Sequence, residues 1–417
     1  MNSANKNMKE AIHVLYGFVV ILLLTSCGNS EKKTNKTIAP ESPVKAEAIK
    51  PIINVYIENS GSMDGYVKGV TEFEQAVYNY LTDIKISQFS DSLNLFYINS
   101  EIIPQGSDIS DFIEKLEPTN FKIKGGSLGT TDISNLLKSV LTETGSNEIA
   151  ILVTDGIFSP GLGKDAEQYL VNQQIGIKSN MADYLKKYPN SAVVIYQLLS
   201  KFDGWYYNRE DSKIKIEEQR PYYIWIIGET DLLNELIRKV PESKFKGSGI
   251  KHTFSITKRL KAVDYAIKRG SGNFDLDKKE PKTTIKNLKK ETKGKQNDVR
   301  FSVNVNFSGF LLSDNYLTDP SNYELNNKDF HLTINKALPN NSGYTHQLNF
   351  ESPSVHKGII SVKLKTQIPQ WVEEINDSIG IVPVKGKTYG IKYQIHGIYE
   401  AFTMSNNYYT EIKIKID

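Results

Sequence analysis

Two patterns of hydrophobic positions divide the chain. In the first half, continuous apolar runs alternate with stretches in which apolar residues recur every three or four positions. Continuous runs are typical of strands covered on both faces, and the longer spacing is typical of amphipathic helices. The apolar runs lie at residues 52–57, 93–98, 149–154, 192–199 and 222–227. This alternation predicts an α/β domain over residues 51–260 with a mostly parallel sheet and helices on both faces.

The helical spacing is clearest after the first strand, where Phe73, Val77, Leu81 and Ile84 recur on one face. The same spacing returns in three later stretches, at residues 133–141, 164–188 and 231–240. Each stretch is long enough for two or more turns, so we expect a helix in each.

From residue 299 the hydrophobic period changes to two. Phe301, Val303 and Val305 alternate with polar residues, and the alternation returns near the C-terminus. The later stretches are 360–364, 391–395 and 412–416. We therefore predict an all-β antiparallel sandwich over residues 299–417. The stretch 261–298 is dense in lysine and poor in large apolar residues, which favours a linker.

The N-terminus has the features of an export signal. Lys6 and Lys9 precede an apolar run, 14–24, that is too short to span a membrane as a helix. The run ends in Leu-Thr-Ser-Cys, which resembles the lipobox of bacterial lipoproteins, where the cysteine becomes the lipidated first residue. Cys27 is the only cysteine of the chain, so disulfides and cysteine metal clusters are excluded. We expect residues 1–27 to be a lipoprotein signal peptide and Cys27 to anchor the protein in a lipid bilayer. The alternative is a cleaved signal with an incidental cysteine.

Residues 28–50 are polar, without periodicity, and predict a flexible tether. Gly28 is not the aspartate that can retain lipoproteins in an inner membrane, so the expected location is the cell envelope, at the outer membrane. The periplasmic and the surface-exposed face both stay open. The net charge of +3 on 417 residues is nearly balanced and does not suggest a nucleic-acid partner.

Three polar loops are expected at one edge of the predicted sheet. Glu58, Ser60 and Ser62 stand at alternate positions after the first strand, so all three can point the same way. The second loop holds Thr130, Thr131 and Asp132, just before a predicted helix, and the third holds Asp155, directly after the run 149–154. Because the carboxyl ends of parallel strands meet at one edge of a sheet, these residues can form one site. As an alternative, Ser, Thr and Asp are also ordinary helix caps, and Asp-Gly is a common turn.

The three polar stretches together resemble the signature of von Willebrand factor type A domains. Residues 58–63 read Glu-Asn-Ser-Gly-Ser-Met, and this is similar to the family's Asp-x-Ser-Gly-Ser-Met. Residues 129–133 read Gly-Thr-Thr-Asp-Ile, and residues 151–156 read Ile-Leu-Val-Thr-Asp-Gly. Both are similar to the family's second and third motifs, in the same order. The resemblance covers about half of the chain and implies a doubly wound, Rossmann-like sheet.

The resemblance also implies a metal-ion-dependent adhesion site. By position, Ser60, Ser62 and Thr131 would be hydroxyl ligands, Asp155 would bind directly or through water, and Glu58 would replace the family's first aspartate. The expected ion is Mg²⁺, with Mn²⁺ or Ca²⁺ as alternatives. An Asp or Glu carboxylate of a protein partner would complete the coordination. Glutamate is longer than aspartate by one methylene, about 1.5 Å, so the loop must be adjusted to keep the octahedron that Mg²⁺ requires.

These features favour a protein-binding module for adhesion or assembly over an enzyme. The six histidines are scattered, and no His-Glu-x-x-His spacing occurs. Two alternatives stay open. One is a metal-dependent hydrolase, in which a metal-activated water or a motif serine attacks the substrate. The other is a metal-free envelope scaffold.

Overall fold

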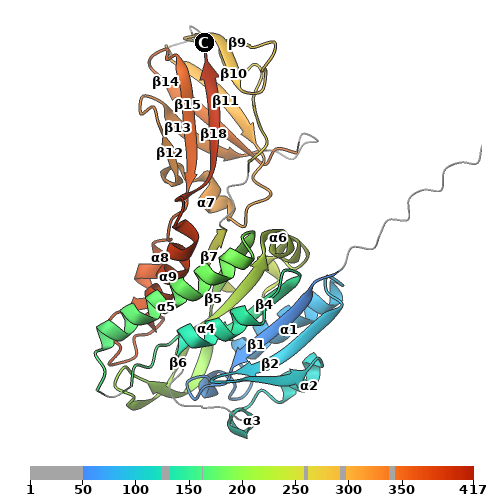
Figure 1. Cartoon of the computed structure of the whole chain (residues 1–417), viewed down its shortest axis with the longest axis vertical. Coiled ribbons are helices and arrows are strands. Elements are labelled where there is room, and N and C mark those ends of the chain that lie inside the picture. The colour runs from blue at the N-terminus through green and yellow to red at the C-terminus, as the bar shows by residue number, and fades with distance from the viewer. Residues whose placement is uncertain (1–49, 124–131, 162, 258–261, 292–296, 338–342) are drawn as a thin grey trace, which may run out of the picture. The chain divides into compact units, whose positions relative to one another are not determined.

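The computed structural model describes residues 50–123, 132–161, 163–257, 262–291, 297–337 and 343–417 (Figure 1). The predicted signal peptide, Cys27, nearly all of the predicted tether and Thr131 lie outside the described residues. Within the described part, no helix is both long and apolar enough to cross a membrane.

The first half of the chain builds a seven-stranded mixed sheet, which corrects the predicted fold class. Its strand order is β3-β2-β1-β4-β6-β5-β7. Only β1 makes parallel pairs, with β2 and β4, and the other four pairings are antiparallel. The sheet is therefore not a doubly wound, mostly parallel one. In order along the sheet, the strands are β3 (Ile102–Gly106), β2 (Ser92–Ile98), β1 (Ile52–Glu58), β4 (Glu148–Thr154), β6 (Lys213–Glu229), β5 (Ser191–Tyr207) and β7 (Ile250–Thr257).

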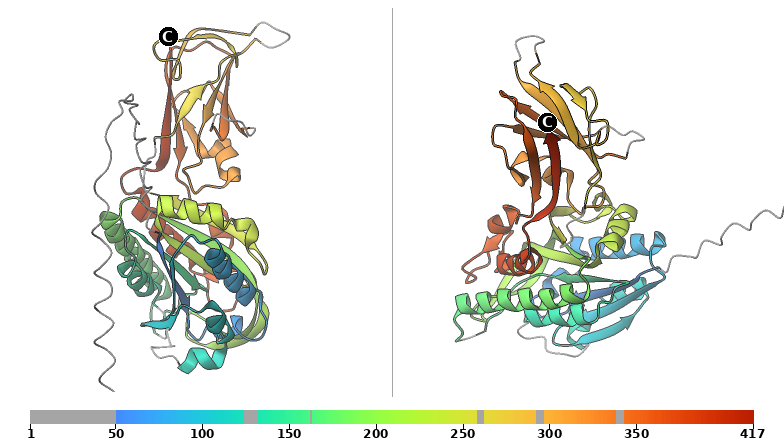
Figure 2. Two further views of the ribbon diagram at one scale, coloured as in Figure 1. Left: turned by 90° about the vertical axis from the view of Figure 1, so that its right-hand side faces the viewer. Right: turned by 45° about the horizontal axis from the view of Figure 1, so that its top comes forward.

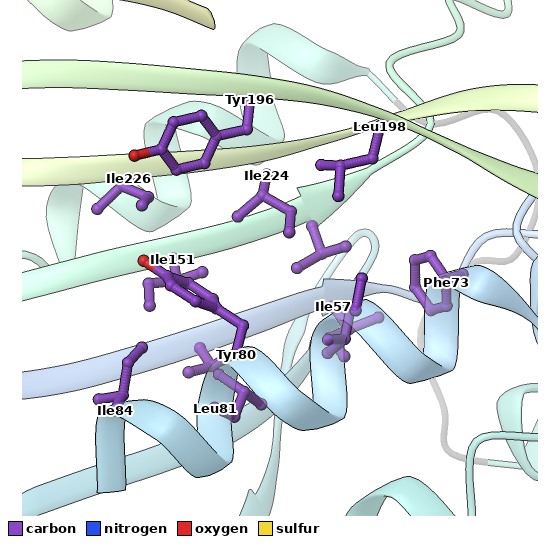
Figure 3. Close-up of a cluster of buried hydrophobic side chains, with 14 of the residues drawn as sticks. Ile57, Phe73, Tyr80, Leu81, Ile84, Ile151, Tyr196, Leu198, Ile224 and Ile226 are labelled. Atoms are coloured by element: carbon purple, nitrogen blue, oxygen red, sulfur yellow. The ribbon is translucent and has the colours of Figure 1, made fainter. Parts of the chain in front are cut away.

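Helices cover both faces of this sheet, as the apolar runs predict (Figure 2). One face packs against α1 (Glu72–Ile86), α2 (Ile109–Glu114) and α6 (Thr230–Lys239). Figure 3 shows Phe73, Tyr80 and Leu81 of α1 reaching strand residues on this face. The other face packs against α4 (Ile133–Thr142) and α5 (Ala166–Lys187). Short helices lie at η1 (Asp64–Tyr66), α3 (Pro118–Ile123) and η2 (Glu242–Lys244).

Because side chains alternate along a strand, β1 contributes to the hydrophobic cores on both faces of the sheet. Val55 and Ile57 of β1 belong to the core under α1, whereas Tyr56 belongs to the core under α4 and α5. Successive side chains of a strand point to opposite faces, so a continuous apolar run is buried on both sides. The predicted helices at 133–141, 164–188 and 231–240 are confirmed as α4, α5 and α6.

The second half of the chain builds two further sheets that share one core. In sheet order, one contains β12 (Tyr323–Leu325), β15 (Gly358–Lys365), β18 (Tyr408–Ile416), β10 (Thr284–Lys289) and β9 (Asn273–Leu276). The other contains β13 (His331–Lys336), β14 (His346–Ser352), β11 (Val299–Val305) and β8 (Tyr265–Ile267). The predicted strands at 360–364 and 412–416 are confirmed within β15 and β18.

Three features correct the predicted all-β antiparallel sandwich. The stretch 261–298 is not a linker, because it supplies β8, β9 and β10, with Ile267, Ile285 and Leu288 in the core. Strand β10 pairs with β18 in parallel. Helices are also present, including α7 (Asp314–Thr318) and the 3₁₀ helix η3 (Pro320–Asn322).

The largest correction concerns the segment between β15 and β18. It contains α8 (Trp371–Glu374), β16 (Asn376–Asp377), β17 (Thr388–Tyr389) and α9 (Ile391–Thr403). The predicted strand at 391–395 is wrong, because Ile391, Ile395 and Ile398 also have helical spacing and lie on one buried face of α9. These side chains join the core beneath α5, and the α9 ribbon lies beside α5 (Figure 1). A segment near the end of the chain therefore completes the hydrophobic core on one face of the first sheet.

Candidate functional site

The candidate site begins where strand β1 ends. Glu58 is the last residue of β1 and is 1% exposed, and the chain turns immediately after it. The Met63 amide donates to the Ser60 carbonyl at 3.0 Å, which closes the turn. The Oγ atoms of Ser60 and Ser62 lie 3.0 Å apart. Ser60 is buried and Ser62 is partly exposed, so this turn reaches from the strand end to the surface.

Strand β4 brings a second set of oxygen atoms to the same edge. Because β1 and β4 are parallel and in register from Ile52 to Ile57, their carboxyl ends lie side by side. The Thr154 hydroxyl donates to Oε2 of Glu58 and accepts from the Gly156 amide. Asp155 follows directly and is 1% exposed. The sequence prediction that Glu58, Ser60, Ser62 and Asp155 gather at one sheet edge is thus consistent with the geometry.

The two carboxylate oxygens of Asp155 differ in their surroundings. Oδ1 accepts from the Ile157 amide at 3.0 Å. Oδ2 is buried and makes no well-formed hydrogen bond with the described residues, although the Ser62 hydroxyl is near enough to lower the pKa of Asp155. Burial is the larger effect and raises the pKa of Asp155 above its ordinary value. A buried acceptor without a donor is costly, so Oδ2 is a natural position for a cation or a proton.

Arg220 supplies positive charge behind the site. Its side chain is 2% exposed and lies over the Tyr206 ring, 4.9 Å from the ring centre. Its Nη1 donates to Glu218 Oε1 and to the Val384 carbonyl, both at 3.3 Å. The charge of Arg220 acts on Asp155 and lowers its pKa, opposing the effect of burial. The buried carboxylate of Asp155 is therefore influenced by a buried guanidinium.

A ribbon formed by β5 and β6 supports the serine turn. Both strands have 17 residues. Among the described residues, 199–207 of β5 and 213–222 of β6 pair only with each other. A Cβ atom on Gly204 would lie 2.7 Å from the Gly65 Cα, so glycine is required for this close approach. Asp203 of the ribbon forms ion pairs with Lys68 and Lys215, which lower the Asp203 pKa to about 2. The turn is thus packed against the ribbon.

The C-terminal segment holds the Asp155 turn from the other side. Gln394 of α9 is fully buried, and its Nε2 donates to the Gly156 carbonyl at 2.6 Å. Gly156 has a φ of +65°, a conformation that favours glycine. The Tyr223 hydroxyl, on β6, donates to Thr388 Oγ1 at 2.9 Å. Residues more than 200 positions apart in sequence therefore fix the same turn.

The hydroxyl and carboxylate oxygens at this site are the type of ligand that a hard cation such as Mg²⁺ prefers. Mg²⁺ binds oxygen at about 2.0–2.1 Å in an octahedron, so two adjacent ligands are about 3 Å apart. The Ser60 and Ser62 hydroxyl oxygens have this separation, which is also that of an ordinary hydrogen bond. The described residues contain no group of three or more His, Cys, Asp or Glu side chains that could hold a metal. A cation here would depend on hydroxyls and on the carboxylates of Glu58 and Asp155.

Other predicted residues have structural roles or stay outside the site. Asp132 caps α4, because its Oδ1 accepts from the Asn135 amide at 3.0 Å. This agrees with the capping alternative for that stretch. Neither Thr131 nor Cys27 can be placed, since both lie outside the described residues.

Sequence reasoning missed Thr154, Arg220 and Gln394. Thr154 was included in the apolar run, although a hydroxyl at the last position of a buried strand needs a partner. Arg220 lies two residues before the apolar run 222–227, and an arginine so close to a buried strand can signal a buried charge. Gln394 carried no local signal, because its role depends on α9 reaching the first sheet.

Comparison of the chain with protein-family models, curated proteins and solved structures gives no match. The resemblance to von Willebrand factor type A domains is therefore wrong as an assignment. No family model supports it, the sheet is mixed where a doubly wound sheet was expected, and the described residues hold no acidic or histidine metal cluster. Short motifs of Ser, Gly and Asp after apolar runs arise readily from turn and cap chemistry, which explains the similarity.

Proposed function

We propose that the chain is an exported, lipid-anchored envelope protein that binds a protein partner through a divalent cation at the β1–β4 edge. The observation that carries this proposal is the buried Oδ2 of Asp155, which lacks a well-formed hydrogen bond beside the Ser60–Ser62 pair. Glu58, Ser60, Ser62 and Asp155 are the residues that would hold the ion. Mg²⁺ fits best by ligand type, and Mn²⁺ would bind the same donors.

Charge balance supports a cation at this edge. Two carboxylates, at Glu58 and Asp155, are 1% exposed, and Arg220 is the buried cation acting on Asp155. A buried carboxylate is costly even when it is hydrogen-bonded, so a further positive charge beside Asp155 would stabilise the site. With few protein carboxylates around it, the ion keeps an affinity for another anionic oxygen. An Asp or Glu of a partner can provide that oxygen, and partly exposed Ser62 marks the direction of approach.

The test measures metal binding on the whole mature chain. Mn²⁺ and Mg²⁺ titrations by calorimetry should show one site in the wild type and none, or at least tenfold weaker binding, in Asp155→Asn. Ser62→Ala should weaken binding as well. Asp183→Asn and Ser139→Ala are matched controls on exposed helix positions and should bind as the wild type does.

Partner binding is tested in envelope extracts with the same variants. The wild type should retain a partner in Mg²⁺ and release it with chelator, whereas Asp155→Asn should retain none. Retention that persists in chelator and in both site variants contradicts the proposal.

A second candidate, a metal-free scaffold, is favoured by one observation. Arg220 is buried and acts on Asp155, so it offers a positive charge without any ion. In this case Mn²⁺ leaves the thermal stability of the wild type unchanged. Metal bound to the native state raises stability with concentration, by about 2.7 kcal/mol at a hundred times Kd. Thermal unfolding with and without Mn²⁺ therefore separates the two candidates.

A further inference from the structure

A loop of the C-terminal segment exposes aliphatic side chains. Residues 378–387 read Ser-Ile-Gly-Ile-Val-Pro-Val-Lys-Gly-Lys and join β16 to β17. Ile379 and Val382 are 63% and 64% exposed, and Val384 is exposed too. In the described part of the chain, no other six-residue stretch has three exposed large hydrophobic side chains. Single exposed hydrophobic residues are ordinary, but a group of them is typical of an interaction surface.

The backbone of this loop is held in place by hydrogen bonds. Arg209, at the tip of the β5–β6 ribbon, donates its amide to the Gly380 carbonyl at 2.9 Å and Nη1 to the Ile379 carbonyl at 3.1 Å. Asp377 Oδ1 accepts from the Ile379 amide at 2.9 Å and from the Gly380 amide at 3.2 Å. The aliphatic side chains thus project from an ordered support, which lowers the entropy lost on binding.

The loop and the candidate site share their supports. Arg220 donates to the Val384 carbonyl, and its charge also acts on Asp155. Tyr223 donates to Thr388 immediately after the loop, and Tyr223 pairs with Thr154 across the β4–β6 ladder. The loop is therefore joined, through two side chains, to the strand end that carries Asp155. Both links are made by residues of β6, so the loop and the Asp155 strand end have a common support.

The charge of the 378–387 loop indicates which charge its binding partner should carry. Residues 378–387 carry two lysines, Lys385 and Lys387, and no carboxylate. Arg209, which contacts the loop at Ile379 and Gly380, is partly exposed. Complementary charge favours an acidic partner surface and disfavours a basic one.

From these observations we propose that the 378–387 loop docks an acidic partner segment in which branched aliphatic residues flank an Asp or Glu. The aliphatic side chains of the partner pack on Ile379, Val382 and Val384, its surrounding acids face Lys385 and Lys387, and its central carboxylate points to the Asp155 edge. The choice of partner rests on the proposed function, because that carboxylate is the group expected to reach the cation.

The test selects ligands for the full mature chain from a random dodecapeptide library in Mg²⁺. The enriched peptides should combine an acidic residue with two or more Leu, Ile or Val. Ile379→Ser/Val382→Ser should weaken their binding by about tenfold or more. The matched control is Val70→Ser/Ile86→Ser, which removes two exposed aliphatic side chains elsewhere and should leave binding unchanged. Lys385→Glu/Lys387→Glu is a second loop variant that keeps the aliphatic residues and should also weaken binding.

The outcomes distinguish the loop from the cation site. Peptides that need Mg²⁺ but bind both loop variants like the wild type overturn the loop proposal and leave the cation site standing. Peptides that lose affinity in the loop variants but ignore chelator support the loop and contradict the cation site. No enrichment, or enrichment of basic or purely polar peptides, overturns the loop proposal.

Discussion

At the scale of single residues, buried charge is the main feature of this protein. Glu58, Asp155 and Arg220 are all nearly inaccessible; Glu58 and Asp155 lie at the ends of the parallel strands β1 and β4, and Arg220 lies on β6. Removing one member of such a group leaves the others unpaired, so single substitutions there change both stability and binding. A different acid, Glu74 on α1, allows the effect of burial on charge to be measured away from the site.

Glu74 forms a capping box with Thr71 at the start of α1. The Glu74 amide donates to Thr71 Oγ1 at 3.2 Å, and the Thr71 amide hydrogen-bonds the Glu74 carboxylate. Burial nevertheless raises the Glu74 pKa from 4.5 to about 7. The folded state therefore binds this proton more tightly than the unfolded state does. Its favourable contribution is complete below pH 4.5 and is lost as the pH rises to about 7.

Glu74→Gln keeps the capping box and removes the charge, so the variant should be more stable than the wild type at alkaline pH. We expect a gain of about 1–2 kcal/mol near pH 8, after allowing for solvent screening, and none near pH 4. Urea unfolding across this pH range measures it. Glu167→Gln, in the exposed first turn of α5, is the control. If the free energy of unfolding has the same pH dependence in Glu74→Gln and in the wild type, the pKa of Glu74 is not raised by burial.

At the scale of elements, α9 is the helix that connects the candidate site to the end of the chain. It packs against α5 through Ile391, Ile395 and Ile398, and Gln394 projects from the same buried face to the Gly156 carbonyl. The helix thus contributes both apolar burial and one specific polar contact.

Replacing Gln394 by Met retains the volume of the side chain and removes the donor. The buried Gly156 carbonyl then loses this hydrogen bond, which should lower the free energy of unfolding by about 1–3 kcal/mol. Urea denaturation measures the loss, and Gln168→Met on the exposed face of α5 should change stability by much less. If both variants are equally stable, the contact from α9 does not fix the Asp155 turn.

At the scale of the whole molecule, the predicted boundary at residue 260 does not separate independent cores. Val372, Ile391, Ile395, Ile398 and Phe402 all lie in the core beneath α5, and each is at most 3% exposed. Burying five such side chains is worth roughly 8–15 kcal/mol. This is as large as the whole stability of a typical domain, about 5–15 kcal/mol.

A fragment of residues 50–260 should therefore fail to unfold cooperatively, although it contains every strand of the first sheet. Circular dichroism during heating and binding of a hydrophobic dye test this, with residues 50–417 as the control. The fragment should bind the dye and show no sharp transition. A cooperative transition in the fragment would mean that the C-terminal segment is dispensable for the first core.

Local sequence patterns were sufficient to predict most helices and to place Glu58, Ser60, Ser62 and Asp155 at one edge of the sheet. Periodicity reports which side of a segment is buried, so α1, α4, α5 and α6 were predictable from neighbouring residues alone. The short alternation at 391–395 was ambiguous because a helix and a strand share those apolar positions over five residues. The polar ribbon of β5 and β6 gave no clear signal either, since it extends past the sheet and is bordered by solvent.

Strand direction, strand partners and the surroundings of Asp155 depend on long-range packing. A buried strand has the same hydrophobic pattern whether it pairs in parallel or antiparallel, so the sequence could not exclude a doubly wound sheet. Arg220 and Gln394 reach the site from positions 65 and 239 residues beyond Asp155. Their contacts depend on long-range packing, which no local pattern encodes.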